Sequence, residues 1–138
     1  FGNRNDGAGG FINIAEGAKK VIFSGTLTSN GLKTKITNGN LKILNEGKNK
    51  KFIKKVRQIT YSSKLGTKRG QTIIFNTDRG VFKFIKNKIT LVEIAQGIRL
   101  KEDILNQIDF PINVSKKLKR ITKKVYLNKK IDLKKILF

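Results

Sequence analysis

The chain has 138 residues, of which 38% are hydrophobic, so it is long and apolar enough for one domain with a buried core. It contains no Cys and no His, which excludes disulfides, zinc sites built on these residues, and Ser-His-Asp or Cys-His nucleophile systems. No apolar run approaches the roughly 18 residues that a membrane helix needs. We therefore predict a cytoplasmic protein without a metal site or a membrane segment.

The net charge is +22, and Lys supplies 25 of the 31 basic residues. Such a charge is typical of a nucleic-acid partner. However, Arg is the preferred residue for bidentate phosphate and base contacts, and it is scarce here. The lysines are also spread along the whole chain, as an AT-rich coding sequence would produce. We favour compositional drift, and we keep a basic nucleic-acid-binding module and a structural interaction domain as alternatives.

Residues 1–10 are a predicted loop, because Gly, Asn and Asp dominate them. The sequence starts inside this loop and has no Met, so we expect the gene product to begin upstream. Phe11–Lys19 follows as a predicted short helix. Lys20–Thr28 is a predicted buried strand that opens on Val, Ile and Phe and ends or bends at Gly25.

Two hairpins are predicted from alternating apolar and polar residues on either side of a turn. The first joins Leu32–Ile36 to Leu41–Leu44 across an Asn-Gly dipeptide, a strong hairpin signal. The second joins Val81–Ile85 to Ile89–Ile94. A sheet built only from such elements would leave edges that need covering, which fits a piece of a larger sheet.

The remaining segments alternate between short strands and helical turns. In chain order, we predict a strand near the end of Phe52–Tyr61, a helical turn at Ser62–Arg69 closed by Gly70, a strand at Thr72–Phe75, and a helix at Leu100–Ile108 before Pro111. Residues 114–138 are a lysine-rich tail with interleaved apolar residues. We expect this tail to dock on a neighbouring surface or on the rest of the protein.

The stretch Gly7–Phe11 carries the clearest chemical signal. Clustered glycines let the backbone turn sharply, and their free N–H groups ahead of a helix suit a phosphate, a carboxylate or a developing oxyanion. Taken alone, this Gly-Ala-Gly-Gly run is equally typical of a tight turn without a ligand. It is not the dinucleotide fingerprint, because no strand precedes it and the spacing differs.

Gly7–Ile14 resembles the glycine motif in the C-terminal half of class I CoA transferases, above all the acyl-CoA:acetate/3-ketoacid and propionate CoA transferases. The resemblance continues in order along essentially the whole chain. It includes Lys19–Thr28, Gly47–Thr60, Arg69–Gln71, Arg79–Phe82, Leu91–Ala95, Gly97-Ile98, Asp103–Leu105 and Asp109-Phe110.

The resemblance implies an α/β fold, an open and mostly parallel sheet flanked by helices and carrying β-hairpins. Residues 1–138 would form its C-terminal section. The implied reaction moves CoA from an acyl-CoA to a short-chain carboxylic acid through a glutamyl-CoA thioester, with CoA as substrate and no cofactor. The family's catalytic Glu lies upstream of the glycine motif, so the isolated chain would be inactive. The rest of the same enzyme and a homo-oligomer are the implied partners.

The same resemblance implies which residues form the site. Gly9 first, and Gly10 second, would donate a backbone N–H to the oxyanion. The substrate-binding residues would be Gly7, Ala8, Phe11, Ser24, Gly25 and Thr26. The last three residues form either a wall of the acyl or pantetheine pocket or merely a kinked strand end. Tyr61 and Phe75 are expected in the core rather than as stacking platforms.

We expect the remaining carboxylates to have structural rather than catalytic roles. Glu16 caps or solvates the first helix, and Glu46 lies on the surface. Glu93 sits in an apolar strand, where a carboxylate needs a partner, so we expect an ion pair with a Lys or Arg. Glu102 and Asp103 fall in the first turn of a helix, where acidic residues suit the helix dipole.

Overall fold

The computed structural model describes residues 9–127. Within this range, the centre is a five-stranded mixed sheet in the order β1-β6-β7-β8-β9. These strands are β1 (Lys20–Gly25), β6 (Thr72–Thr77), β7 (Gly80–Ile85), β8 (Lys88–Ile94) and β9 (Asn113–Arg120). The two edge pairings, β1 with β6 and β8 with β9, are parallel, whereas the two hairpin pairings between them are antiparallel. The α/β class and the hairpins expected from the sequence are confirmed.

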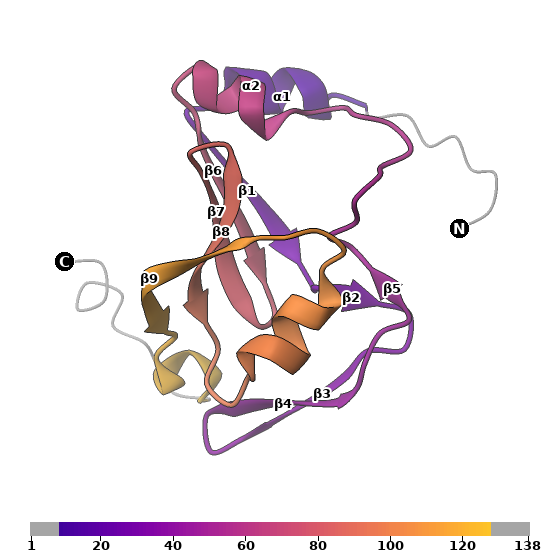
Figure 1. The fold of residues 1–138 in the computed structure, drawn as a ribbon, viewed down its shortest axis with the longest axis vertical. Helices are drawn as coiled ribbons and strands as arrows, with labels where there is room; N and C mark the ends of the chain where they lie inside the picture. The colour runs from indigo at the N-terminus through magenta and orange to yellow at the C-terminus, as the bar shows by residue number, and fades with distance from the viewer. Residues whose placement is uncertain (1–8, 128–138) are drawn as a thin grey trace.

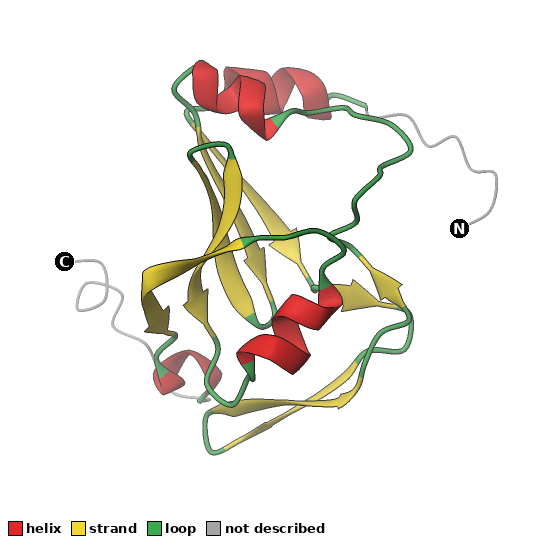
Figure 2. Ribbon diagram, viewed as in Figure 1, coloured by secondary structure: helices red, strands yellow, loops and turns green. Residues whose placement is uncertain are grey.

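Shorter elements surround this sheet (Figures 1 and 2). The helices α1 and α2 lie at one end, and the hairpin of β3 and β4 lies at the other. The bounds are α1 (Phe11–Gly17), α2 (Ser63–Lys68), β2 (Thr28–Ser29), β3 (Lys33–Thr37), β4 (Asn40–Asn45) and β5 (Asn49–Lys50). Three helical turns complete the described chain: η1 (Leu100–Ile104), η2 (Leu105–Gln107) and η3 (Lys123–Tyr126).

Both predicted hairpins form, and their turns have positive φ. Asn38 and Gly39 have φ of 51° and 73°, and Lys86 and Asn87 have φ of 48° and 62°. Two consecutive residues with positive φ match the right-handed twist of the strands that they join. The Asn-Gly dipeptide therefore predicted its hairpin turn reliably, whereas Lys-Asn is not a sequence typical of such a turn.

The core lies between one face of the sheet and the segments that follow β1 and β8. It is built from buried aliphatic side chains and one phenylalanine: Leu27, Leu41, Phe82, Leu91, Ile94, Ala95, Ile98, Ile104 and Ile108. The predicted helix at 100–108 supplies two of these residues. It forms as a π-helical turn followed by a 3-10 turn rather than as a regular α-helix. The Asp103 carboxylate accepts the backbone N–H of Arg99 at its start, at 2.8 Å.

The prediction of a strand within Phe52–Tyr61 is wrong, because the chain is irregular between β5 and α2. Its two end residues are held by aromatic contacts, Phe52 to Phe82 at 5.1 Å and Tyr61 to Phe23 at 5.8 Å between ring centroids. The apolar residues between them do not face a common core, and Ile59 is 75% exposed. The segment therefore connects Phe52 to Tyr61 without forming a strand.

The beginning of the lysine-rich tail belongs to the sheet of this chain. As β9, it pairs in parallel with β8, and the backbone N–H of Ile121 donates to the Ile94 carbonyl at 2.9 Å. The Tyr126 hydroxyl donates to the backbone carbonyl of Asp78 at 3.4 Å. Residues 128–138 lie outside the described residues.

Candidate functional site

The carboxyl ends of β1 and β6 lie side by side, because the two strands are parallel and in register from Lys20↔Thr72 to Gly25↔Thr77. Ligands of open α/β sheets bind outside such strand ends. A cavity of about 220 Å³ opens here. Its lining residues are Phe23, Ser24, Gly25, Thr26, Lys51, Phe52, Phe75, Asn76 and Thr77. The structure thus places Ser24, Gly25 and Thr26 together on one wall.

Lys51 lies against this wall and is held at two points. Its Nζ donates to Thr26 Oγ1 at 2.9 Å, and its backbone N–H donates to the Leu27 carbonyl at 3.2 Å. The Thr26 hydroxyl in turn donates to the backbone carbonyl of Thr28 at 2.6 Å. Sequence reasoning did not single out Lys51, because no local signal separates it from the other lysines.

A second cavity, of about 470 Å³, adjoins the first and shares the walls Phe23 and Phe75 with it. Aromatic and aliphatic side chains dominate its lining, namely Phe11, Phe23, Val56, Ile59, Tyr61 and Phe75. Phe23 stacks on Phe75 with ring centroids 5.2 Å apart and an angle of 15° between their planes. Tyr61 and Phe75 are half-buried, so each contributes both to packing and to this surface.

The glycine loop reaches the second cavity through Phe11, the first residue of α1. Gly9 has a φ of +53°, a conformation that favours glycine, whereas Gly10 has a φ of −75° and forms the N-cap of α1. Both residues are exposed. Gly7 and Ala8 lie outside the described residues.

The side chain of Gln71 fixes α1 and Tyr61 relative to each other. Its Nε2 donates to three carbonyl oxygens around the end of α1, those of Ala15 at 2.7 Å, Glu16 at 3.2 Å and Ala18 at 2.5 Å. Its Oε1 accepts the Tyr61 hydroxyl at 3.0 Å. The tyrosine hydroxyl is therefore occupied, and burial raises the pKa of Tyr61.

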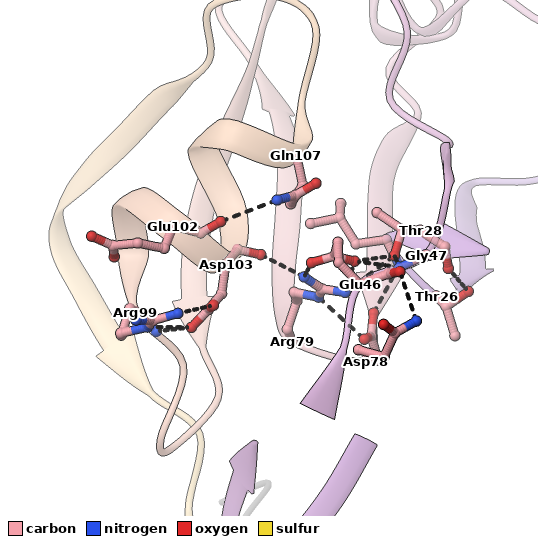
Figure 3. Close-up of polar contacts among 12 residues, drawn as sticks. Thr26, Thr28, Glu46, Gly47, Asp78, Arg79, Arg99, Glu102, Asp103 and Gln107 are labelled. Atoms are coloured by element: carbon pink, nitrogen blue, oxygen red, sulfur yellow. Dashed lines mark hydrogen bonds and ion pairs between the residues drawn. The ribbon is translucent and has the colours of Figure 1, made fainter. Parts of the chain in front are cut away.

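An ionic cluster with a buried centre directly follows the end of β6 (Figure 3). Its centre is Arg79, whose side chain is fully buried in the turn between β6 and β7. The guanidinium pairs with the carboxylates of Glu46 and Asp78, at 2.8 Å and 3.2 Å, and also donates to the Asp103 carbonyl at 2.7 Å. Asp78 Oδ1 accepts the backbone N–H of Leu27 at 2.7 Å. The cluster thereby fixes the chain immediately after Thr26.

Glu46 lies partly on the surface, with 31% of its side chain exposed, but its carboxylate is paired with Arg79. Its carboxylate also accepts the Thr28 hydroxyl, and it accepts the Gly47 N–H at 3.0 Å. Burial raises the pKa of the Glu46 carboxyl, but the hydrogen bonds from Arg79, Thr28 and Gly47 outweigh burial and hold it below the usual value. Burial likewise lowers the pKa of Arg79, and the two carboxylates more than reverse this effect.

The other carboxylates have different partners. Glu16 on α1 pairs with Arg69 at 3.5 Å. Asp103 pairs with Arg99 at 2.9 Å. No ion pair forms at Glu93 within residues 9–127, although Lys119 is its cross-strand neighbour. The partner expected for Glu93 is therefore not found there. The residue is only half-buried, so its carboxylate has less need of a partner than a fully buried one.

Within the described range, no group of three or more acidic residues is placed to hold a metal ion. No helix between residues 9 and 127 is long and apolar enough to cross a membrane.

In sequence and in fold, this section of an α/β sheet is similar to known CoA transferases. Acetate CoA-transferase YdiF of Escherichia coli (strain K12) is 41% identical over 128 residues, which are 93% of this chain and 24% of that protein. Caffeate CoA-transferase of Acetobacterium woodii is 42% identical over 129 residues, which are 94% of this chain and 24% of that protein. No family model matches the chain.

Two crystal structures of the acyl-CoA transferase YdiF from Escherichia coli O157:H7 share the fold. The apoenzyme superposes with a TM-score of 0.89 at 40% identity, over 94% of this chain and 25% of that one. The thioester complex with CoA superposes with a TM-score of 0.85 at 42% identity, over 88% of this chain and 24% of that one. The chain spans about a quarter of the length of the relatives that it matches. It is a section of the CoA-transferase fold, and the resemblance inferred from its sequence is confirmed.

Proposed function

We propose that this chain forms part of an enzyme that moves CoA from an acyl-CoA to a carboxylic acid through a glutamyl-CoA thioester. One observation carries the proposal. Phe11, next to the glycine loop, lines one cavity, and Ser24, at the carboxyl end of β1, lines the adjoining one. Both segments were expected at the site. The similarity to CoA transferases over 93% of the chain supports this assignment.

In this proposal the chain contributes backbone groups and pocket walls. Attack of a carboxylate on a thioester carbonyl produces a tetrahedral oxyanion, which N–H donors stabilise. Gly9 is the first candidate for such a donor and Gly10 the second. Phe11, Ser24, Gly25 and Thr26 form the surrounding pocket. A substrate-binding role for Gly7 and Ala8 stays a prediction, because both lie outside the described residues. The nucleophilic Glu comes from a segment outside this chain.

The proposal also covers the acceptor acid, the oligomeric state and the cellular location. The names of two relatives mention acetate and caffeate, and we propose a short-chain carboxylic acid as the first substrate class to test. CoA takes part as a substrate rather than as a cofactor. We also propose a homo-oligomer in the cytoplasm.

The distribution of positive charge does not favour a nucleic-acid site. Exposed lysines occur on elements throughout the fold, including β1, β3, α2, β7 and β9. Arg69, Arg79 and Arg99, the residue type best suited to phosphate contacts, pair with acidic residues of this chain.

A chimera tests the proposed function. This chain replaces the matching section of Escherichia coli YdiF, and CoA transfer from acetyl-CoA to a carboxylic acid is measured. We expect a folded chimera to transfer CoA, and both YdiF lacking the section and the isolated 138-residue chain to show no turnover. A chimera that folds, as judged by circular dichroism, yet transfers no CoA would contradict the proposal. Turnover by the isolated chain would contradict the external nucleophile.

A further inference from the structure

Gln71 is a buried residue at the start of β6 whose side chain reaches back to α1. It is only 7% exposed, and its backbone N–H donates to the Gly66 carbonyl at 3.0 Å. The next residue, Thr72, donates its N–H to the Lys19 carbonyl at 3.0 Å and begins the in-register pairing of β6 with β1. The backbone of Gln71 is therefore fixed, so its side chain acts from a fixed point.

The Nε2 group of Gln71 holds the end of α1. The last carbonyl groups of a helix have no partner within the helix. Nε2 lies within 3.2 Å of three such oxygens, those of Ala15, Glu16 and Ala18, and it carries two N–H groups to donate to them. Among residues 9–127, no other side chain donates to a carbonyl group of α1. Gln71 is thus the polar contact that fixes this end of the helix.

The oxygen of the same amide holds the start of α1 through Tyr61. Oε1 accepts the Tyr61 hydroxyl at 3.0 Å. The Tyr61 ring contacts the ring of Phe11, the first residue of α1, with the centroids 6.3 Å apart. A hydroxyl donor on one side and carbonyl acceptors on the other determine which way the amide points. One side chain therefore fixes α1 at its end and, through Tyr61, at its beginning.

Gly66 of α2 leaves the space that this arrangement needs. It is buried, and a Cβ there would overlap the Tyr61 hydroxyl and lie 2.7 Å from Gln71 Oε1. Glycine is an unfavourable residue inside a helix. The hydrogen bond between Tyr61 and Gln71 explains its presence in α2.

The helix that Gln71 holds begins directly after Gly9 and Gly10, the two candidate oxyanion donors. The Gly10 carbonyl accepts the Ile14 N–H at 3.1 Å, so Gly10 belongs to the first turn of α1. A helix of seven residues does not keep its place without contacts to the rest of the fold. We propose that Gln71 is a positioning residue for CoA transfer, because it fixes α1 and thereby the direction of the Gly9 and Gly10 N–H groups. The inference rests on the proposed function, which gives these N–H groups their catalytic role.

The kinetics of the YdiF chimera test this inference. Gln71→Met keeps the length of the side chain and removes both hydrogen-bonding groups. We expect kcat and kcat/KM to fall together by about tenfold, with KM within about twofold, because a misplaced donor is missed mainly in the transition state. Gln107→Met is the matched control, since the Gln107 amide bonds only to the Glu102 carbonyl within residues 9–127, at 3.2 Å. Equal losses for both variants, or a rise in KM alone, would overturn the inference.

A double-mutant cycle separates positioning from a general loss of stability. Gly9→Val removes the proposed donor, so adding Gln71→Met to it should lower kcat by less than about twofold, whereas independent effects multiply. A further loss of about tenfold in that background would overturn the inference.

Tyr61→Phe carries the same cycle if Gln71→Met does not fold. This milder variant keeps the Gln71 amide and removes one hydrogen bond, so kcat should fall by about fivefold alone and by less than about twofold beside Gly9→Val. An undiminished loss beside Gly9→Val would contradict the role of Gln71.

Amide hydrogen exchange in the same chimera needs no activity. Mass spectrometry of peptides covering residues 9–19 should show that Gln71→Met speeds exchange in α1 by about fivefold or more, the effect of losing a hydrogen bond, and that Gln107→Met does not. Unchanged exchange would overturn the inference whether or not the chimera is active. Faster exchange in an inactive chimera would keep Gln71 as the anchor of α1 and reject CoA transfer. An active chimera whose kcat is unaltered by Gln71→Met would reject the inference and leave the proposed function standing.

Discussion

Arg79 and Glu46 form a two-point ion pair, with Nη1–Oε2 at 2.8 Å and Nη2–Oε1 at 3.0 Å. Together with the bonds to Asp78, Thr28 and the Asp103 carbonyl, this pair gives every N–H of the Arg79 guanidinium an acceptor. The contacts come from Thr28 after β1, from Glu46 after β4 and from Asp103 in η1. Arg79 therefore connects three parts of the chain that are remote in sequence.

Arg79→Met should lower the free energy of unfolding by about 3 kcal/mol, because it leaves the Glu46 and Asp78 carboxylates without their shared cation. Urea denaturation monitored by circular dichroism measures this change. Arg57→Met is the control, since Arg57 is exposed and the same change there should stay within about 0.5 kcal/mol. Similar losses for both variants would mean that the ion pair contributes no net stability.

Stability should fall as the pH decreases through the acidic range. The pKa values of Glu46 and Asp103 lie below their usual values of 4.5 and 3.8, because hydrogen bonds from Arg79 and Arg99 outweigh the effect of burial. The folded state then binds fewer protons than the unfolded state, so these groups stabilise it above about pH 4.5 and lose this effect below. Urea titrations between about pH 7 and pH 3 measure the slope, and Glu46→Gln should reduce it. A slope of the opposite sign would contradict these pKa directions.

Much of this fold could be predicted from the sequence, because the signals are local. The Asn38-Gly39 turn, the apolar opening of β1 and the cap of α2 each depend on neighbours along the chain. The helical turns at 100–107 were predictable as helical from the spacing of Ile104 and Ile108. Their irregular geometry was not, because it depends on tertiary packing and on the side chain of Asp103.

The polar framework of the site was not predictable, for a physical reason. Arg79, Gln71 and Lys51 act through partners far away in sequence, such as Glu46 and Ala15. No periodic pattern encodes such pairs, and a lysine-rich composition hides Lys51 among many others. The resemblance to CoA transferases indicated which loops would matter, but not which side chains hold them.

Gly97→Ala should destabilise the protein more than Gly70→Ala. Both glycines have positive φ, +83° and +80°, so both variants share a conformational cost of about 1 kcal/mol. A Cβ at Gly97 would lie 2.5 Å from the Leu41 carbonyl oxygen, whereas a Cβ at Gly70 would meet no atom of the described residues within 4 Å. We expect the overlap to add about 1–3 kcal/mol for Gly97→Ala, measured by urea denaturation. Equal losses would show that the β3–β4 hairpin moves aside without cost.

Gly9→Val in the YdiF chimera should reduce kcat by a factor of about 100 or more, the effect of losing one oxyanion donor. A β-branched residue does not tolerate the φ of +53° at Gly9, so the backbone N–H would turn away. Gly10→Ala is the matched control, because its φ of −75° suits any residue, and among residues 9–127 its Cβ would meet only Ile14 Cδ1, at 3.9 Å. Little change in kcat for Gly9→Val would mean that the loop acts only as a turn.

The parallel pairings at both edges of the sheet determine the order in which it can assemble. Tight turns connect β6, β7 and β8, so these strands can pair as soon as they are formed. β1 must instead wait for the whole connection 26–71 to close, and β9 must wait for 95–112, each at a greater cost in chain entropy. The contacts of Gln71 with α1 and of Arg79 with Glu46 can form only after such remote segments have come together. Substitutions there should therefore speed unfolding far more than they slow folding.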